Sequence, residues 1–438
     1  MPTQTEPVAT RDKRLQNWQF ATVTLMLTGY AGYYLCRSDL SVAMPLLISD
    51  LAARGLLPSV AKVQLGGIAS LGVLAYAVAK VPSGWLADSL GGRRNFLFGM
   101  GGAIFFTVLF GIGGGLPIFT LAWIGNRFVQ SLGWAGMVKI TSKWVSYSRY
   151  GTVMGIISLS FLFGDAASRA FLAGLISAGF GWRSLFFAAA VVVGVLFLIN
   201  LLFLRETPLT LGLPEPPASS ENLFRADPES GQAWSMGHLV GTLLRSPAFL
   251  LACVLSLGLT ILRETFNLWT PTYFTQALGM SPARAAQNSA LFPLFGGFSV
   301  ILAGCLSDRL GRTGRASVLF YGTLFTAATT AVVAFVHFRA SSVIPVVLVS
   351  LIGFVLIGPY SYLAGAMSLD FGGKQGSATA SGLIDTAGYL GAVLAGSMIA
   401  GVSVRWGWTG AFTLLAAVAL LSAGAAAAYL FGGPRQNR

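Results

Sequence analysis

Charged side chains are scarce in this sequence. Of its 438 residues only 10% are Asp, Glu, Lys or Arg, whereas 55% are hydrophobic and the mean hydropathy is +0.72. A chain of this length would suggest about three soluble domains, but so few charges cannot cover that many water-exposed surfaces. The composition therefore predicts an integral membrane protein.

Histidine and cysteine are also rare, with two and three residues. Cys36, Cys253 and Cys305 all lie in apolar runs without metal-ligand spacing, so neither a disulfide framework nor a zinc site is expected. No group of nucleophile, base and metal ligands stands out, which makes an enzyme the least favoured class of protein. We expect no catalytic residue, no metal and no cofactor.

Apolar stretches long enough to cross a bilayer, about 20 residues each, alternate with short polar segments. The longest polar interval, residues 205–246, contains several prolines and serines and predicts a cytoplasmic linker. We therefore expect an all-α protein with a six-helix bundle at 1–204, this linker, and a second six-helix bundle at 247–438. The predicted transmembrane helices are 19–45, 62–87, 95–113, 117–145, 150–178, 184–204, 247–277, 285–306, 316–338, 343–368, 376–402 and 408–431.

Basic residues outnumber acidic residues, 28 to 15, and the formal net charge is +13. The charges are scattered over many loops instead of forming one patch, which argues against nucleic-acid binding. Most of them fall in loops that would face the cytoplasm, while the outward loops, including the one assigned to Lys62, have about one each. The charge distribution predicts that both termini are cytoplasmic. The polar N-terminal stretch shows no signal-peptide pattern.

The two halves of the sequence repeat each other. A Gly-x-Leu-x-Asp-x-x-Gly pattern followed by arginine begins at Gly84 and again at Gly304, and Gly-Trp pairs at 181 and 407 are 226 positions apart. The aspartates of this loop, Asp88 and Asp308, are expected at helix ends, where the arginines neutralise them. Parallel repeats of six helices are typical of the major facilitator superfamily and predict its fold.

Two arginines, Arg37 and Arg263, lie inside apolar runs and are also 226 positions apart. A charge near the bilayer centre costs roughly 2.5–3.5 kcal/mol or more, so each needs a partner or a ligand. A structural alternative is snorkelling, or an ion pair of Arg37 with Asp39, although residues two apart point to different helix faces. Since a guanidinium binds phosphate with two hydrogen bonds, the pair predicts an anion site between the halves.

Two further cations lie inside predicted helices, Lys80 in 62–87 and Arg127 in 117–145. Lys80 either snorkels towards the adjacent loop or adds a positive charge to the site, and it shares a helix face with Tyr76. Arg127, in a run from Asn126 to Trp134, resembles a superfamily pattern whose arginine takes part in coupling. We expect Arg127 to act in coupling or gating.

Acidic residues inside the apolar runs are few. Asp165 and Arg169 are four positions apart, a spacing that favours an ion pair within one helix. Asp385 has no cation nearby in the sequence, so it either transfers a proton, binds a cationic substrate group or pairs with another helix. Glu264 directly follows Arg263 and is expected to tune that arginine.

The motifs in both halves resemble the organophosphate:phosphate antiporter family of the major facilitator superfamily. They are Gly29 to Pro45, Lys80, Gln130 to Trp134, Leu262 to Tyr273, and Gly388 to Gly391. The resemblance implies exchange of inorganic phosphate for a phosphorylated metabolite by rocker-switch alternating access. It also implies a monomer in a bacterial inner membrane, phosphate binding by Arg37 and Arg263 with Lys80, and an aromatic cavity lining of Tyr30, Tyr34, Tyr76, Trp134 and Tyr389.

Several positions differ from the glycerol-3-phosphate members of that family. Phe161 replaces a histidine, Thr260 replaces a tyrosine, and Asp165 and Asp385 stand where those members have glycine. We therefore expect a different substrate, such as one with an amine, or added proton coupling. Two alternatives remain: a membrane sensor that binds a sugar phosphate with little flux, and a proton-coupled carrier of non-phosphorylated organic anions.

A phosphate bound by both arginines would draw the first and seventh helices together. Without it, two like charges would face each other, and the empty carrier would reorient slowly. The two arginines alone therefore predict obligatory exchange.

Overall fold

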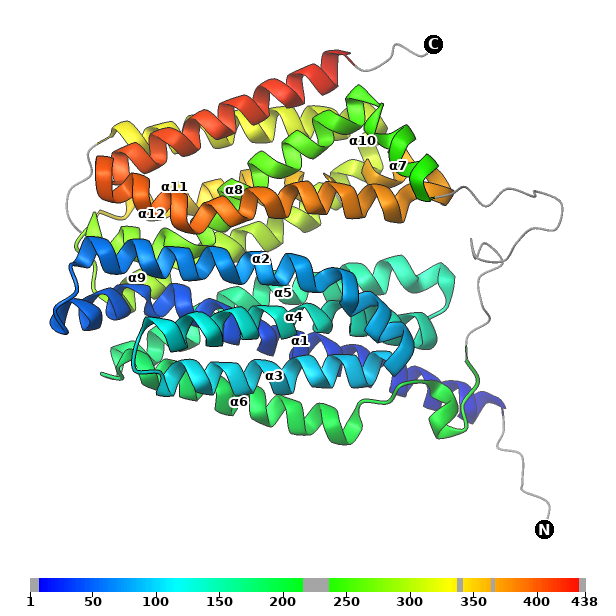
Figure 1. The fold of residues 1–438 in the computed structure, drawn as a ribbon. Coiled ribbons are helices and arrows are strands. Elements are labelled where there is room, and N and C mark those ends of the chain that lie inside the picture. The colour runs from blue at the N-terminus through cyan, green and yellow to red at the C-terminus, as the bar shows by residue number, and fades with distance from the viewer. Residues whose placement is uncertain (1–7, 216–235, 337–341, 364–366, 433–438) are drawn as a thin grey trace. The chain divides into compact units, whose positions relative to one another are not determined.

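The computed structural model describes residues 8–215, 236–336, 342–363 and 367–432. Within these ranges the chain is helical and contains no strand. Helices form because a bilayer offers no water to the backbone, whose polar groups must then bond within each segment. The first half contains the helices α1 (Val8–Ala53), α2 (Pro58–Leu90), α3 (Gly92–Ile112), α4 (Leu116–Trp144), α5 (Tyr147–Ser177) and α6 (Trp182–Phe203) (Figure 1).

The second half begins after the region predicted to be a linker. That region contains a short 3-10 helix, η1 (Pro208–Leu211), and a short α-helix, α7 (Met236–Leu244). The remaining helices are α8 (Pro247–Gln276), α9 (Pro282–Ser289), α10 (Leu291–Phe335), α11 (Ile344–Ser361) and α12 (Ser368–Gly432).

The number of membrane crossings agrees with the number predicted from the sequence, although two crossings can belong to one continuous helix. Nine segments of the described chain are long and apolar enough to span a membrane. The last of these, Ala380–Phe431, has 52 residues, enough for two crossings of about 20 residues each. With α1 and α4, whose apolar runs contain charged residues, these segments account for every predicted transmembrane helix.

The reversal between the last two crossings lies at Gly407. Its φ of 70° is in the left-handed region, which glycine adopts without strain because it has no Cβ. In Figure 1 the orange part of α12 and the red part that follows run in opposite directions. Gly407 falls between the predicted helices 376–402 and 408–431.

The helices form two compact units. Unit 1 contains Met1–Arg37, Ala75–Asp165 and Arg183–Asn222. Unit 2 contains Ser38–Leu74, Ala166–Trp182 and Leu223–Arg438, so that α1, α2 and α5 contribute to both. The division of the chain into two six-helix bundles at 1–204 and 247–438 stays a prediction.

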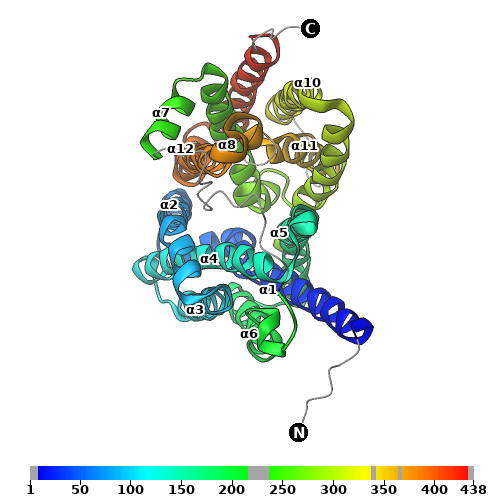
Figure 2. The same cartoon turned by 90° about the vertical axis from the view of Figure 1, so that its right-hand side faces the viewer.

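In unit 1, α1 packs against α3 and α4 around Tyr33. The hydroxyl group of this buried tyrosine donates to the carbonyl oxygen of Phe96, 2.5 Å away. A Cβ at Gly133 of α4 would lie only 2.9 Å from the tyrosine ring, so the close approach depends on glycine. Helices α3 and α4 lie side by side in both views (Figure 1 and Figure 2).

In unit 2, α2 packs closely against α12. A Cβ at Gly66 would lie 2.8 Å from the carbonyl oxygen of Gly396. One turn further, the Ser70 hydroxyl donates to the carbonyl oxygen of Val393 at 2.5 Å and accepts from the amide of Ser397 at 2.9 Å. Small residues and hydrogen bonds of this kind hold membrane helices together, because apolar side chains are equally well accommodated by lipid.

Candidate functional site

Arg37 lies within α1, as the sequence predicted, and its guanidinium group is held by aromatic side chains of unit 1. Its Nη1 atom donates to the hydroxyl oxygen of Tyr34 at 2.8 Å. Its Cζ atom lies 5.0 Å from the centre of the Tyr34 ring and 4.7 Å from that of the Tyr76 ring. Such cation–π contacts compensate part of the cost of removing the charge from water.

Tyr76 brings two further cations to the same place. Its buried ring has Arg127 Cζ at 5.0 Å and Lys80 Nζ at 5.9 Å from the ring centre, in addition to Arg37. The cations come from α1, α2 and α4, so three helices contribute positive charge around one phenol ring. This cluster, Arg37, Tyr76, Lys80 and Arg127, is called the Tyr76 cluster below. A concentration of positive charge inside a membrane segment attracts an anion.

The predicted cavity-lining aromatic residues of unit 1 form a chain of ring contacts that leads to Arg37. The Tyr30 ring centre is 5.7 Å from that of Tyr34 and 5.8 Å from that of Trp134. The Tyr34 ring is also 6.0 Å from that of Phe161. An apolar ring from α5 therefore lies next to the tyrosine that contacts Arg37.

Arg127 is almost completely buried, with 3% of its surface exposed. Its neighbours are fixed by hydrogen bonds: Gln130 Nε2 donates to Asn126 Oδ1 at 2.5 Å and to the carbonyl oxygen of Cys36 at 3.1 Å. Its Nη1 atom is buried and has no hydrogen-bond partner among the described residues. Gln130 thus joins α4 to α1, next to Arg127 of the Tyr76 cluster.

Arg263 lies in α8 and belongs to unit 2. Its Nε and Nη2 atoms donate to Glu264 Oε1, at 3.1 and 2.5 Å. Its Cζ atom lies 4.6 Å from the ring centre of Tyr360 in α11. The expected influence of Glu264 on Arg263 is therefore present as an ion pair, while Tyr360 was not predicted to be near the site.

The other predicted residues of unit 2 lie on α12. Asp385 and Tyr389 are half-buried and one helical turn apart. Between them, a Cβ at Gly388 would lie 2.8 Å from the hydroxyl oxygens of both Ser256 and Thr260, which shows that α12 packs directly on α8 here. Thr260 donates to the carbonyl oxygen of Ser256 at 2.6 Å, so its hydroxyl group serves its own helix.

The structure leaves several predictions untested. Arg37 and Arg263 belong to different units, and an anion site shared by both therefore stays a prediction. Asp165 is buried in α5, and its pairing with Arg169 also stays a prediction. The side chains of Asp88 and Asp308 lie outside the described residues, and their role at the helix ends stays a prediction.

Lys62 makes contacts that the sequence did not predict. It is the first residue of the predicted helix 62–87 and lies within α2, where it is 4% exposed; its assignment to the outward side stays a prediction. Its Nζ atom is 4.0 Å from the ring centre of Trp408, 5.6 Å from that of Trp269 and 3.0 Å from Gln276 Oε1. The lysine joins α2 to α8 and α12 within unit 2. No local pattern indicates this, since its partners are more than 200 positions away.

Arg169 makes a second buried connection in unit 2. Its Nη2 atom donates to the carbonyl oxygen of Asn267 at 2.8 Å, and its Nη1 atom donates to Ser289 at 3.2 Å. The hydroxyl of Ser41 lies 2.8 Å from the carbonyl oxygens of both Asn267 and Leu268. Segments of α1, α2 and α5 are thus bound to α8 and α9 by polar contacts.

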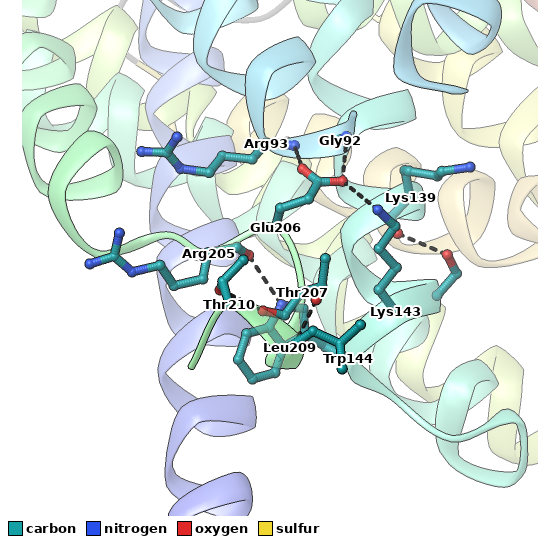
Figure 3. Close-up of polar contacts among 11 residues, drawn as sticks. Gly92, Arg93, Lys139, Lys143, Trp144, Arg205, Glu206, Thr207, Leu209 and Thr210 are labelled. Carbon is teal, nitrogen blue, oxygen red and sulfur yellow. Dashed lines mark hydrogen bonds and ion pairs between the residues drawn. The ribbon is translucent and has the colours of Figure 1, made fainter. Parts of the chain in front are cut away.

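Glu206 forms another contact that the sequence did not predict (Figure 3). Its Oε2 atom accepts from the amide of Arg93 at 2.6 Å, and its Oε1 atom accepts from the amide of Gly92 and from Lys143 Nζ, both at 3.0 Å. The carboxylate therefore caps the N-terminus of α3, where the helix dipole favours negative charge, and pairs with the end of α4.

The surroundings of Glu206 act on its pKa in opposite directions. Burial disfavours the charged carboxylate and would raise the pKa, but the hydrogen bonds from Arg93, Lys143 and Gly92 outweigh it and hold the pKa below its ordinary value of 4.5. Arg93 also donates from Nε to the carbonyl oxygen of Leu204 and from Nη2 to that of Leu201, each at 2.6 Å. The loop arginine thus fixes the end of α6, a role that no local pattern revealed.

Comparison with protein families identifies the fold. The model of the Major Facilitator Superfamily matches residues 26–396, most of the chain. The chain belongs to the major facilitator superfamily. The fold class predicted from the repeated loop motif is therefore confirmed.

Curated relatives narrow the comparison within this superfamily. A probable hexose phosphate transport protein of Chlamydia trachomatis is 29% identical over 94% of this chain and 90% of its own. The glycerol-3-phosphate transporter of Bacillus subtilis is 26% identical over 90% and 88%, and the membrane sensor protein UhpC of Escherichia coli is 26% identical over 94% and 92%. These relatives confirm the predicted resemblance to the organophosphate:phosphate antiporter family, and none of the three is named as an enzyme.

Solved structures of major facilitator proteins have the same fold. A bacterial homologue of the human lysosomal transporter Spinster superposes with a TM-score of 0.72, covering 94% of this chain and 96% of its own at 14% identity. The nucleoside transporter NupG gives a TM-score of 0.69 at 15% identity, covering 94% and 99%. At such low identity these likenesses concern the fold alone.

Proposed function

We propose that this major facilitator protein exchanges a phosphorylated organic anion for inorganic phosphate. The observation that supports this most is the Tyr76 cluster, in which three helices supply cations around one buried ring. Arg37, to which the family resemblance implies a phosphate-binding role, contacts the rings of Tyr34 and Tyr76. A fixed, planar guanidinium can bind a phosphoryl group through two hydrogen bonds.

In this proposal Arg263 supplies the second cation, from the C-terminal half. A phosphoryl group bound by Arg37 and Arg263 draws α1 and α8 together, and the two halves of the protein rock around this group. Lys80 and Arg127 add positive charge, and Tyr30, Trp134 and Tyr389 contact the organic part. As part of the same proposal, the protein is a monomer in a bacterial inner membrane with both termini in the cytoplasm.

The experiment is phosphate exchange in proteoliposomes that contain the purified protein and internal phosphate. External radiolabelled phosphate is added with sugar phosphates, triose phosphates, phosphonates or carboxylates as competitors. We expect Arg37→Lys and Arg263→Lys to reduce exchange at least about tenfold, because lysine cannot form the two-pronged contact. Arg245→Lys, at an exposed position before α8, is the matched control and should exchange normally. Exchange that survives both site substitutions would contradict the proposal.

A sensor function is the second candidate, because the Escherichia coli relative that matches 94% of this chain is named a membrane sensor. A sensor would bind a sugar phosphate with little flux. The same proteoliposomes distinguish the two functions: binding of a sugar phosphate without exchange favours the sensor, and exchange favours the carrier.

A further inference from the structure

Arg263 is paired with its own neighbour in the chain. Glu264 Oε1 accepts hydrogen bonds from two nitrogen atoms on one edge of the guanidinium group, Nε at 3.1 Å and Nη2 at 2.5 Å. The side chains are 18% and 23% exposed, so the pair is mostly removed from water but not sealed off. The ring of Tyr360, 4.6 Å from Cζ, covers a face of the guanidinium.

This pairing is not the default for adjacent residues. Successive side chains on an α-helix point about 100° apart, and neighbours in sequence do not ordinarily face each other. Here the glutamate bends towards the arginine and contacts the edge that a phosphoryl group would use for a two-pronged contact. The carboxylate and a phosphate oxygen therefore compete for the same two N–H groups.

We propose that Glu264 is an internal counter-anion of Arg263, which neutralises the arginine in the empty site and which the incoming phosphoryl group must displace. The proposal rests on the proposed phosphate-binding function of Arg263. A phosphate dianion has more charge than a carboxylate, so it can win this competition. The displaced carboxylate is partly exposed, so it can turn towards water.

The proposal changes what is expected of the empty carrier. Two unneutralised arginines would oppose reorientation and would make exchange obligatory. With Glu264 on Arg263, the empty site has one positive charge less, and the empty carrier reorients more readily. Wild-type protein should therefore catalyse some net phosphate efflux in addition to exchange, and the ratio of net efflux to exchange should depend on Glu264.

The test compares wild type with Glu264→Gln, which keeps the shape of the side chain and removes its charge. Asp50→Asn is the matched control, since Asp50 also pairs with an arginine, Arg54 at 2.7 Å, but at the end of α1. Three quantities are measured: the phosphate concentration that gives half-maximal exchange, net phosphate efflux into phosphate-free buffer, and phosphate binding to purified protein by calorimetry. Thermal unfolding in detergent shows whether each variant is folded.

We expect Glu264→Gln to lower the half-saturating phosphate concentration by about twofold to fivefold, the range that a partly exposed ion pair allows. Its net efflux should fall relative to exchange, while Asp50→Asn should behave as wild type. An unchanged or higher half-saturating concentration in a folded Glu264→Gln protein would overturn the proposal.

Competition with 2-aminoethylphosphonate and ethylphosphonate distinguishes the counter-anion role from an alternative role for Glu264, the binding of a substrate amine. If the substitution weakens only the amine-bearing compound, the carboxylate binds a substrate cation instead of acting as a counter-anion, and the proposal fails. If wild type neither exchanges nor binds phosphate, the proposed function fails. In that case phosphate binding by Glu264→Gln alone would support the counter-anion role of Glu264. A Glu264→Gln protein that also fails to bind phosphate would overturn it.

Discussion

The ammonium group of Lys62 lies 4.0 Å from the ring centre of Trp408, and Gln276 accepts a hydrogen bond from both side chains, at 3.0 and 3.3 Å. A buried lysine is costly unless it is compensated, and here two indole rings and an amide oxygen provide that compensation. The contact joins α2, from the first half of the sequence, to α12, from the second. It therefore resists separation of these helices.

Replacement of Lys62 by methionine should loosen this end of unit 2. Methionine keeps an apolar stem but loses the cation–π contacts and the hydrogen bond, together worth about 2 kcal/mol when desolvated. The helices should then separate more often. A cysteine introduced at Ser41, which is 3% exposed, should react about tenfold faster with a membrane-impermeant maleimide.

The control for Lys62→Met is Arg405→Met. Arg405 also makes a cation–π contact, with Trp406 at 5.3 Å, but it is exposed and on the same helix as Trp408. Its replacement should leave the reaction rate unchanged. Equal rates in wild type and Lys62→Met would show that this lysine does not hold the helices together.

Tyr76 should matter through its ring more than through its hydroxyl group. Tyr76→Leu removes the ring that faces Arg37, Arg127 and Lys80, whereas Tyr76→Phe keeps it. Each cation–π contact is worth about 0.5–2 kcal/mol, so the leucine variant should raise the half-saturating phosphate concentration about tenfold or more. The phenylalanine variant should have the smaller effect. If both variants behave alike in the exchange assay, the ring does not organise the cations.

Glu206→Gln should destabilise the protein. The substitution removes a charged acceptor for the amides of Gly92 and Arg93 and for Lys143, and hydrogen bonds to charged groups contribute about 1.5–3 kcal/mol. We expect a fall of several degrees in melting temperature in detergent. Glu215→Gln, at an exposed position in the same polar region, should have little effect. Equal melting temperatures for the two variants would rule out the capping role.

The stabilisation by Glu206 should depend on pH in one direction. Because its pKa is held below the ordinary value of 4.5 in the folded protein, its contribution is fully present above that value. It is lost as the pH falls through the lower, folded-state pKa. The difference in melting temperature between wild type and Glu206→Gln should therefore be constant from about pH 6 to about pH 8 and shrink below about pH 4. A difference that grows in acid would contradict this assignment.

The contact of α2 with α12 should tolerate a larger side chain at Gly67 but not at Gly66. Gly66→Val would place atoms against the carbonyl oxygen of Gly396, whereas a Cβ at Gly67 meets nothing within 4 Å. Overpacking typically costs about 1–3 kcal/mol. We expect Gly66→Val to lower the melting temperature and Gly67→Val to change it little. Similar values for the two valine variants would mean that the helices do not pack as closely as described.

Local sequence patterns were sufficient to predict the helices and the intramembrane position of Arg37. The apolar runs, the repeated Gly-Trp pairs and the intramembrane position of Arg37 follow from composition and spacing, which depend on neighbouring residues only. The resemblance to a known family added the aromatic residues. Of these, Tyr34 and Tyr76 contact Arg37, and Tyr30 contacts Tyr34 and Trp134. These predictions concern residues that are close in sequence or already paired by a motif.

The contacts that the sequence missed join residues far apart in the chain. Lys62 is the first residue of the predicted helix 62–87, and its partner Gln276 is 214 positions away. Glu206 lies in what reads as the start of a linker, and the amide that it caps at Gly92 is 114 positions away. No periodicity or spacing can indicate such partners, because they depend on how the helices pack.

The contacts of Glu206 also determine where the chain could be divided. The segment after α6 is part of unit 1, since Glu206 caps α3, and Leu204 and Leu213 are both buried. An N-terminal fragment that ended at the last residue of α6 would lose this cap and expose the start of α3. Separately expressed halves that are meant to reassemble should therefore be cut after Leu213, so that the first fragment retains its own closing segment.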